Sequence, residues 1–98
     1  MAPKSDKEAL EIIINALTHA GWELNYVYDG EEKIRVSDTE SAIEAIWPVD
    51  AAYLFVKLPN TDTHGNVFFV LGNEPEEIAN DWSECLNPTV SDLVQEWF

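Results

Sequence analysis

Basic residues are scarce in this chain, and the last 41 positions lack them altogether. Lysine and arginine together number 5 against 19 aspartates and glutamates, which gives a formal net charge of −14 over 98 residues. No lysine or arginine follows Lys57. Lysine and arginine contacts to phosphates supply most of the affinity for nucleic acid, and a negative field repels anionic surfaces. The sequence therefore argues against direct binding to nucleic acid or to an anionic membrane.

Cysteine and long apolar stretches are also lacking. Cys85 is the only cysteine, so no disulfide can form within the chain. No apolar run approaches the ~20 residues that cross a bilayer, and no apolar stretch follows the charged N-terminus as a signal peptide would require. We expect one soluble domain over residues 1–98, with residues 1–5 disordered, in a reducing cytoplasm.

No group of residues has the spacing of a metal site or a catalytic motif. His19 and His64 are the only histidines and lie far apart in the sequence. The stretch from Asn60 to Gly65 weakly resembles the start of a calcium loop, but Leu71 stands at the twelfth position, where a glutamate is required. Cys85 falls on the apolar side of a predicted helix, which predicts a buried and inert thiol. We therefore expect no catalytic residue, no metal and no cofactor, and a protein that is not an enzyme.

The composition is nevertheless that of a folded domain. Hydrophobic residues make up 46% of the chain, which is too apolar for a disordered acidic tail. The excess of carboxylates is therefore expected on the surface. Its simplest role is solubility, and the alternative is an interaction that depends on charge.

Two helices are predicted in the first half. Ser5 to Glu8 has the form of a capping box, and the four apolar residues that follow have the spacing of one helical face. These residues are Leu10, Ile13, Ile14 and Leu17. This pattern predicts a helix over residues 6–20, ended by Gly21. Ser37 to Glu40 is a second capping box, and Pro48 ends its helix near Ile46.

A β-hairpin is predicted between these helices. Residues 22–28 alternate in polarity and predict a strand, and residues 33–36 form the returning strand. A three-residue loop over 28–30, with Gly30 in the left-handed region, pairs Leu24 with Ile34 and Trp22 with Val36. This register is favoured because it keeps apolar residues on one face.

The second half is predicted to hold a further hairpin and two helices. Strands over 51–58 and 67–71 carry apolar residues on both faces, so we expect them to be central or covered on both sides. Helical spacing predicts a third helix over 75–86 and a last helix from Val90. The element order is then α-β-β-α-β-β-α-α. The simplest assembly is an α+β fold with a four-stranded, mainly antiparallel sheet and helices packed on it.

Several of these segments together resemble a known group of proteins. They are the turn at Tyr28 to Glu32, the capping box at residues 37–40, and the segment from Gly72 to Trp82. With them the chain resembles small acidic proteins of bacteriophages, prophages and integrative elements. The resemblance implies an origin in a phage or mobile element, and that group has no assigned activity.

The predicted third helix carries the main candidate binding residues. Four carboxylates are spaced at i, i+3, i+7 and i+10, which places them on one helical face. They are Glu74, Glu77, Asp81 and Glu84. Their steps of ~4.5–6 Å along the axis are comparable to the spacing of phosphates along a nucleic-acid strand. One hypothesis is a mimic of nucleic acid that binds a basic host protein, and the other is a solvated helix face.

Trp97 and Phe98 are the second candidate. Trp97 completes an apolar stripe on the last helix, which favours docking in the core. The alternative is an aromatic anchor for a partner or for a second copy. The sequence thus leaves two functions open: binding to a basic host protein, or a small structural or assembly domain, perhaps a dimer, whose acidity serves only solubility.

Overall fold

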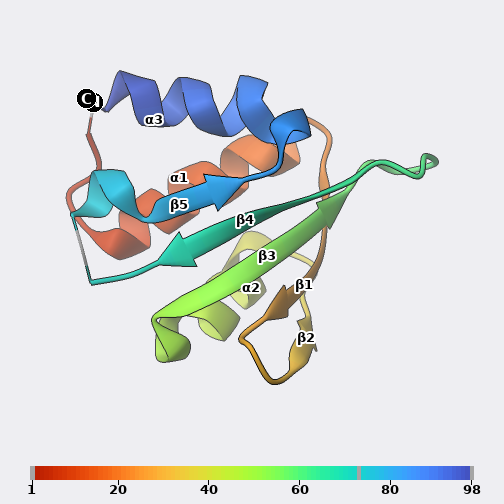
Figure 1. Cartoon of the computed structure of the whole chain (residues 1–98), viewed down its shortest axis with the longest axis horizontal. Coiled ribbons are helices and arrows are strands. Elements are labelled where there is room, and N and C mark those ends of the chain that lie inside the picture. Colours follow the sequence, from red (N-terminus) through yellow and green to blue (C-terminus); the bar gives the residue numbers. More distant parts are fainter. Residues whose placement is uncertain (1, 73, 98) are drawn as a thin grey trace.

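Five antiparallel strands form one sheet in the order β2-β1-β3-β4-β5 (Figure 1). The computed structural model describes residues 2–72 and 74–97. The strands are β1 (Glu23–Tyr28), β2 (Lys33–Arg35), β3 (Ala51–Lys57), β4 (His64–Val70) and β5 (Ala79–Trp82). The helices are α1 (Asp6–His19), α2 (Thr39–Ile46) and α3 (Asp92–Glu96). The α+β class is confirmed, but the prediction of four strands is wrong, because the sheet has a fifth.

The helix α1 forms where its sequence pattern predicts it. The Ser5 hydroxyl accepts a hydrogen bond from the Glu8 N–H at 3.2 Å, which caps the first turn. The apolar face is fully buried against the sheet. After the helix, Gly21 has a φ of +100°, which a residue with a side chain adopts only at a cost. The helix therefore turns sharply into β1.

The second helix begins one residue later than its predicted capping box. Asp38, and not Ser37, is the capping residue: its carboxylate accepts from the Ser41 N–H at 2.8 Å, and the Ser41 hydroxyl accepts from the Asp38 N–H. The pKa of Asp38 is lowered mainly by the hydrogen bond from the Ser41 N–H and, to a smaller extent, by the Ser41 side chain. As predicted, α2 ends at Ile46 before Pro48.

The β1–β2 hairpin has a different register from the predicted one. Val27 lies opposite Ile34 and Tyr28 opposite Lys33, so the loop has four residues, 29–32. Gly30 is left-handed, as predicted, with a φ of +102°. The Asp29 carboxylate accepts from the N–H groups of Glu32 and Glu31, each at 2.8 Å, and these bonds lower the pKa of Asp29. The carboxylate thus closes the loop that sets the register.

A bulge in β1 explains why the predicted register is wrong. Leu24 lies opposite Val56 and Tyr26 opposite Phe55, so Asn25 is an extra residue on β1. A bulge shifts the inward–outward alternation by one position. Leu24 and Val27 are therefore both buried, and Tyr26 and Tyr28 turn to the other face.

The predicted helix over residues 75–86 is wrong. Pro75–Glu77 is a single 3-10 turn, Ala79–Trp82 is the strand β5 paired with β4, and Glu84–Leu86 is another 3-10 turn. The Val70 N–H donates to the Ile78 carbonyl at 2.8 Å, and the Ser83 N–H donates to the Asn66 carbonyl at 3.0 Å. Pairing with the edge of β4 thus prevails over a helical spacing in which Asn80 and Asp81 are poor helix formers.

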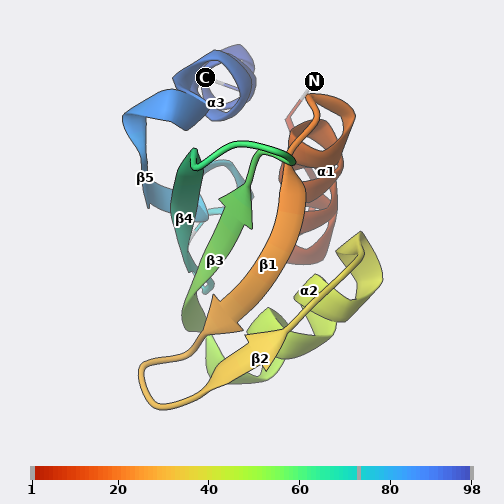
Figure 2. The same cartoon turned by 90° about the vertical axis from the view of Figure 1, so that its right-hand side faces the viewer.

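The core lies between one face of the sheet and the helices. Figure 2 shows α1 and α2 on the same side of β1, β3 and β4, and in the described part of the chain the opposite side carries no helix. Asn87–Ser91 forms a π-helical turn that leads into α3, and this C-terminal segment packs against α1 and the β5 side of the sheet. Leu86, Val90 and Trp97 enter the core from it. β3 is central, as predicted, but it is covered on one side only.

Candidate functional site

The sheet face opposite the helices, here called the open face, carries most of the aromatic side chains that are at least partly exposed among the described residues. Side chains alternate between the two faces of a strand, and residues opposite each other on paired antiparallel strands share a face. The strand registers therefore define rows that run across the sheet. The first row is Lys33, Tyr28, Tyr53, Phe68 and Asp81, and the second is Arg35, Tyr26, Phe55 and Asn66.

The aromatic rings of the open face contact one another across three strands. Tyr26 stacks on Phe55 with ring centroids 4.6 Å apart and an interplanar angle of 15°. Tyr53 stacks on Phe68 at 4.6 Å and 28°, and Tyr53 and Phe55 are 6.2 Å apart. These four rings, Tyr26, Phe55, Tyr53 and Phe68, form one continuous surface, the aromatic platform. Offset stacked pairs of this kind are favourable beyond the area that they bury.

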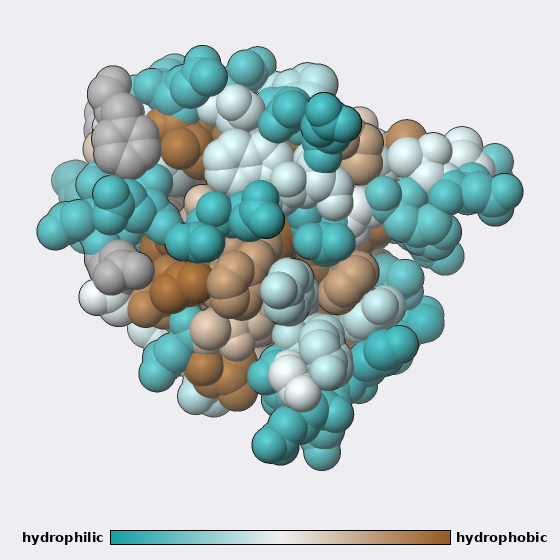
Figure 3. Space-filling model, viewed as in Figure 1, coloured by the Kyte–Doolittle hydropathy of each residue, from teal (hydrophilic) through white to brown (hydrophobic). Residues whose placement is uncertain are grey.

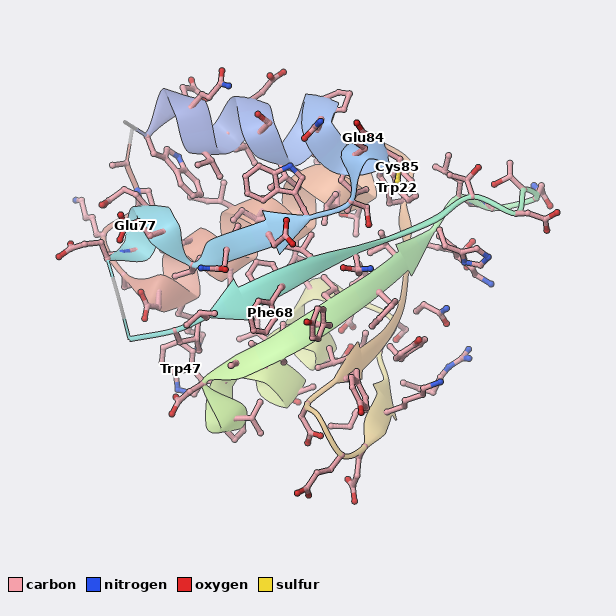
Figure 4. The ribbon with its side chains drawn as sticks, in the orientation of Figure 1. Trp22, Trp47, Phe68, Glu77, Glu84 and Cys85 are labelled. Atoms are coloured by element: carbon pink, nitrogen blue, oxygen red, sulfur yellow. The ribbon has the colours of Figure 1, made fainter. Side chains whose placement is uncertain are left out.

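The platform remains accessible to a partner. Tyr53 is 39% exposed, and Tyr26, Phe55 and Phe68 are half-buried. Figure 3 shows apolar surface near the middle of this side of the molecule, over β3 and β4, with polar side chains around it. Trp47, 47% exposed, lies just before β3, where Figure 4 labels it. Apolar surface that gathers in one place on a small domain indicates an interaction site.

Basic residues gather on the open face in a chain that has few of them. Three of the five lie there: Lys33 and Arg35 begin the two rows, and Lys57 follows Phe55 by two residues on the same face of β3. The Lys33 ammonium lies 5.0 Å from the centroid of the Tyr26 ring, within cation–π distance. Asp81 lies at the opposite edge of the same row. The open face is therefore basic along β2, aromatic in the middle and acidic at β5.

The four carboxylates predicted to share a helix face do not do so. Glu74 precedes the 3-10 turn, Glu77 ends it, Asp81 lies in β5, and Glu84 begins the next turn. Glu77 and Glu84 lie at the two ends of β5 (Figure 4). All four are exposed, so they belong to the surface, but the regular stripe on which the phosphate comparison depended is absent.

The two predicted aromatic anchors have different outcomes. Trp97 is only 8% exposed and belongs to the core, which confirms core docking over the exposed anchor. Phe98 lies outside the described residues. Cys85 was predicted to be buried, and this is wrong: it is exposed, and its thiol donates to the His64 carbonyl at 3.5 Å.

The remaining features of the described residues are a hollow between two helices and two carboxylates that cap local structure. Among residues 2–72 and 74–97, no three histidines, cysteines or carboxylates are grouped as metal ligands. An open hollow of about 410 Å³ lies between α1 and α2, where the Thr39 hydroxyl donates to the Asn15 side-chain oxygen at 2.6 Å. The carboxylates with a lowered pKa, Asp29 and Asp38, are engaged in a turn and a helix cap. None of the helices described is long and apolar enough to cross a membrane.

Sequence reasoning missed the open face, although one signal pointed to it. The apolar residues on both faces of β3 predict a strand that is central or covered on both sides, and only the first of these holds. Two of the predicted helices pack on the same side, and the segment predicted as the third pairs as β5 instead. Comparison with protein-family models, characterised proteins and solved structures gives no match.

Proposed function

We propose that this chain is a small, non-enzymatic protein-binding domain, and that the open face is its binding surface. The observation that carries the proposal is the aromatic platform, which joins β1, β3 and β4 on a sheet face without a covering helix among the described residues. The platform joins strands that are already held by backbone pairing, and its rings remain partly exposed. Function therefore explains their accessibility better than folding does.

The chemistry of the surface favours a protein as the partner. Tyrosine and phenylalanine are enriched at protein interfaces, where rigid rings bury a large area at low entropic cost. Small molecules prefer concave sites, and the hollow described above lies away from the open face, between α1 and α2. Aromatic platforms also stack nucleic-acid bases, but a net charge of −14 opposes the approach of a polyanion.

A second candidate uses the acidic surface instead. In this proposal the chain is a phage or prophage-type protein that acts in the host cytoplasm and binds a basic host protein. It is supported by the net charge and by the exposure of Glu77, Asp81 and Glu84. These carboxylates do not form a regular row, so general charge attraction replaces mimicry of a phosphate backbone in this candidate.

Salt separates the two candidates in a capture experiment. Immobilised wild type, Tyr53→Lys and Gln95→Lys are exposed to cell lysate at low salt and at ~0.5 M salt, where the screening length is below ~5 Å. Tyr53→Lys places a charge in the aromatic platform. Gln95→Lys makes the same charge change on the exposed side of α3.

The open-face proposal expects capture of a defined protein that persists at high salt, is lost in Tyr53→Lys and is kept in Gln95→Lys. Capture that both variants retain at low salt, and that ~0.5 M salt abolishes, would instead favour the acidic surface. Equal high-salt capture by all three proteins would contradict the open-face proposal.

A further inference from the structure

We propose that the open face binds a second copy of this chain, sheet against sheet, around a two-fold axis parallel to β3. The inference rests on the proposed function, because it names the partner of the same surface. It is drawn from the distribution of charge along the first row of the open face, from Lys33 to Asp81.

The first row carries opposite charges at its two ends. Lys33 lies on β2, Asp81 lies on β5, and three aromatic residues lie between them. Four steps between strands, each ~4.8 Å, place the two charged residues ~19 Å apart. They therefore cannot form an ion pair within one chain. Within the row, three aromatic residues separate each charge from the other, and neither end of the row itself holds a counter-charge.

A two-fold axis parallel to β3 supplies the missing counter-charges. It reverses the strand order of the second copy, so that β2 of each copy faces β5 of the other. The dimer then has two equivalent contacts, in each of which Lys33 of one copy faces Asp81 of the other. Tyr53 faces its own equivalent on the axis, and Tyr28 faces Phe68. An interface of this kind is isologous, as in most small homodimers, and aligned sheets commonly pack with their strand directions within ~30°.

The charges also select this axis over the other two-fold axis that lies in the plane of the sheets. An axis perpendicular to the strands places β2 against β2 with its direction reversed, so that Lys33 of each copy lies against Arg35 of the other. Like charges that face each other at an interface are strongly unfavourable. With the axis parallel to β3, Arg35 instead faces Ser83, which bonds to Asn66 in its row and precedes the exposed Glu84. Only Lys57 faces its equivalent, at the end of β3, and Glu23 lies beside it.

The size of the surface sets the expected affinity. Strands of seven residues and a sheet of five strands give a footprint of ~20 Å by ~20 Å. This is below the usual size of specific interfaces and in the range of weak, transient ones, and two copies of net charge −14 also repel each other. The dissociation constant of the dimer should therefore be micromolar or weaker. Sedimentation equilibrium of the purified chain should then show a mass that rises with concentration from 11.1 kDa towards twice that value.

Charge exchange between the two ends of the row tests the geometry. Lys33→Asp and Asp81→Lys each place two like-charged contacts in the dimer and should weaken self-association at least ~10-fold. Mixed in equal amounts, the two variants form a heterodimer in which both contacts are attractive. We therefore expect dimerisation to return in the mixture, while each variant alone associates at least ~10-fold more weakly than the wild type. Gln95→Lys is the matched control and should dimerise as the wild type does.

Each outcome decides the inference. Mixed dimers that form only from the two complementary variants establish the pairing of Lys33 with Asp81 between copies. A wild type that stays monomeric at several hundred micromolar overturns the inference. This holds whether or not the monomer binds single-stranded RNA on its aromatic platform. The inference is also overturned if Lys33→Asp and Asp81→Lys each self-associate as strongly as the wild type. It is overturned as well if mixing the two weakened variants does not restore dimerisation. If the pure protein is monomeric but Tyr53-dependent capture from lysate persists at high salt, the proposed function stands and only this inference fails.

Discussion

Phe68 and Phe69 are neighbours in β4 and lie on opposite faces of the sheet. Phe69 is fully buried beneath the helices, and Phe68 stacks on Tyr53 in the aromatic platform. The same residue type thus occurs once in the core and once on the open face. This pair allows the stabilities of the two faces to be compared directly.

Alanine substitutions at these two positions should differ in cost. Phe69→Ala removes a fully buried ring and should lower the free energy of unfolding by ~3–5 kcal/mol. Phe68→Ala loses mainly the stacked contact and should cost ~0.5–1.5 kcal/mol. Urea denaturation at low protein concentration, where self-association is absent, measures both. Equal losses would mean that the open face is covered in the folded chain.

The cap of α2 should make stability depend on pH. Hydrogen bonds from Ser41 lower the pKa of Asp38 below that of the unfolded chain. The ionised carboxylate therefore stabilises the fold above the unfolded pKa of ~3.9, and the contribution is lost as the pH falls through the folded pKa. Asp38→Ala should then be less stable than wild type at pH 7, and the difference should shrink by pH ~2.5.

Asp38→Asn is the control for this prediction. Asparagine also caps helices well, but its side chain does not titrate. Asp38→Asn should keep most of the wild-type stability at pH 7. Its difference in stability from Asp38→Ala should not shrink at pH ~2.5, because neither side chain titrates. Urea midpoints at the two pH values measure all three proteins. A constant gap between wild type and Asp38→Ala would show that the charge of the cap is unimportant.

Trp97 should contribute to stability and not to association. It is buried with Leu86 and Val90 in the core beside α1, so Trp97→Ala should cost ~3 kcal/mol in urea denaturation. Self-association of the folded variant should match that of the wild type, because the residue lies away from the open face. A variant of full stability that no longer associates would restore the anchor interpretation.

Cys85 should react in the folded protein. Its side chain is exposed, so a thiol reagent such as Ellman's reagent should label it without prior unfolding. Stopped-flow labelling in buffer and in urea below the unfolding midpoint should give rates that stay proportional to reagent concentration. A reaction that begins only above the midpoint would support the buried thiol predicted from the sequence.

The sequence predicted the elements whose signals are local. Helix α1 has its cap and its apolar face within one segment, and α2 is placed to within a residue by the predicted capping box at 37–40 and by Pro48. The strand β3 is equally clear from its apolar run. These patterns depend on contacts that neighbours in the sequence can make, so they appear in the sequence itself.

Elements defined by distant partners were predicted wrongly. Ile78 and Trp82 are spaced as on a helix, yet the segment between them pairs with β4 as its edge strand. No local pattern reports that β4 has a free edge. The candidate site was missed for the same reason, because Tyr53 and Phe55 could be assigned to an open face only once the positions of the helices were known.

The bulge at Asn25 lets β1 carry one residue more than its partner strand without changing which side chains face the core. With Asn25 present, Leu24 and Val27 are both buried and Tyr26 and Tyr28 face outwards. Deletion of Asn25 leaves Tyr26 alone between Leu24 and Val27, so a regular strand keeps both of these residues on the buried face and both tyrosines on the open face. The core and the aromatic platform can therefore both survive the gain or loss of this one residue in β1.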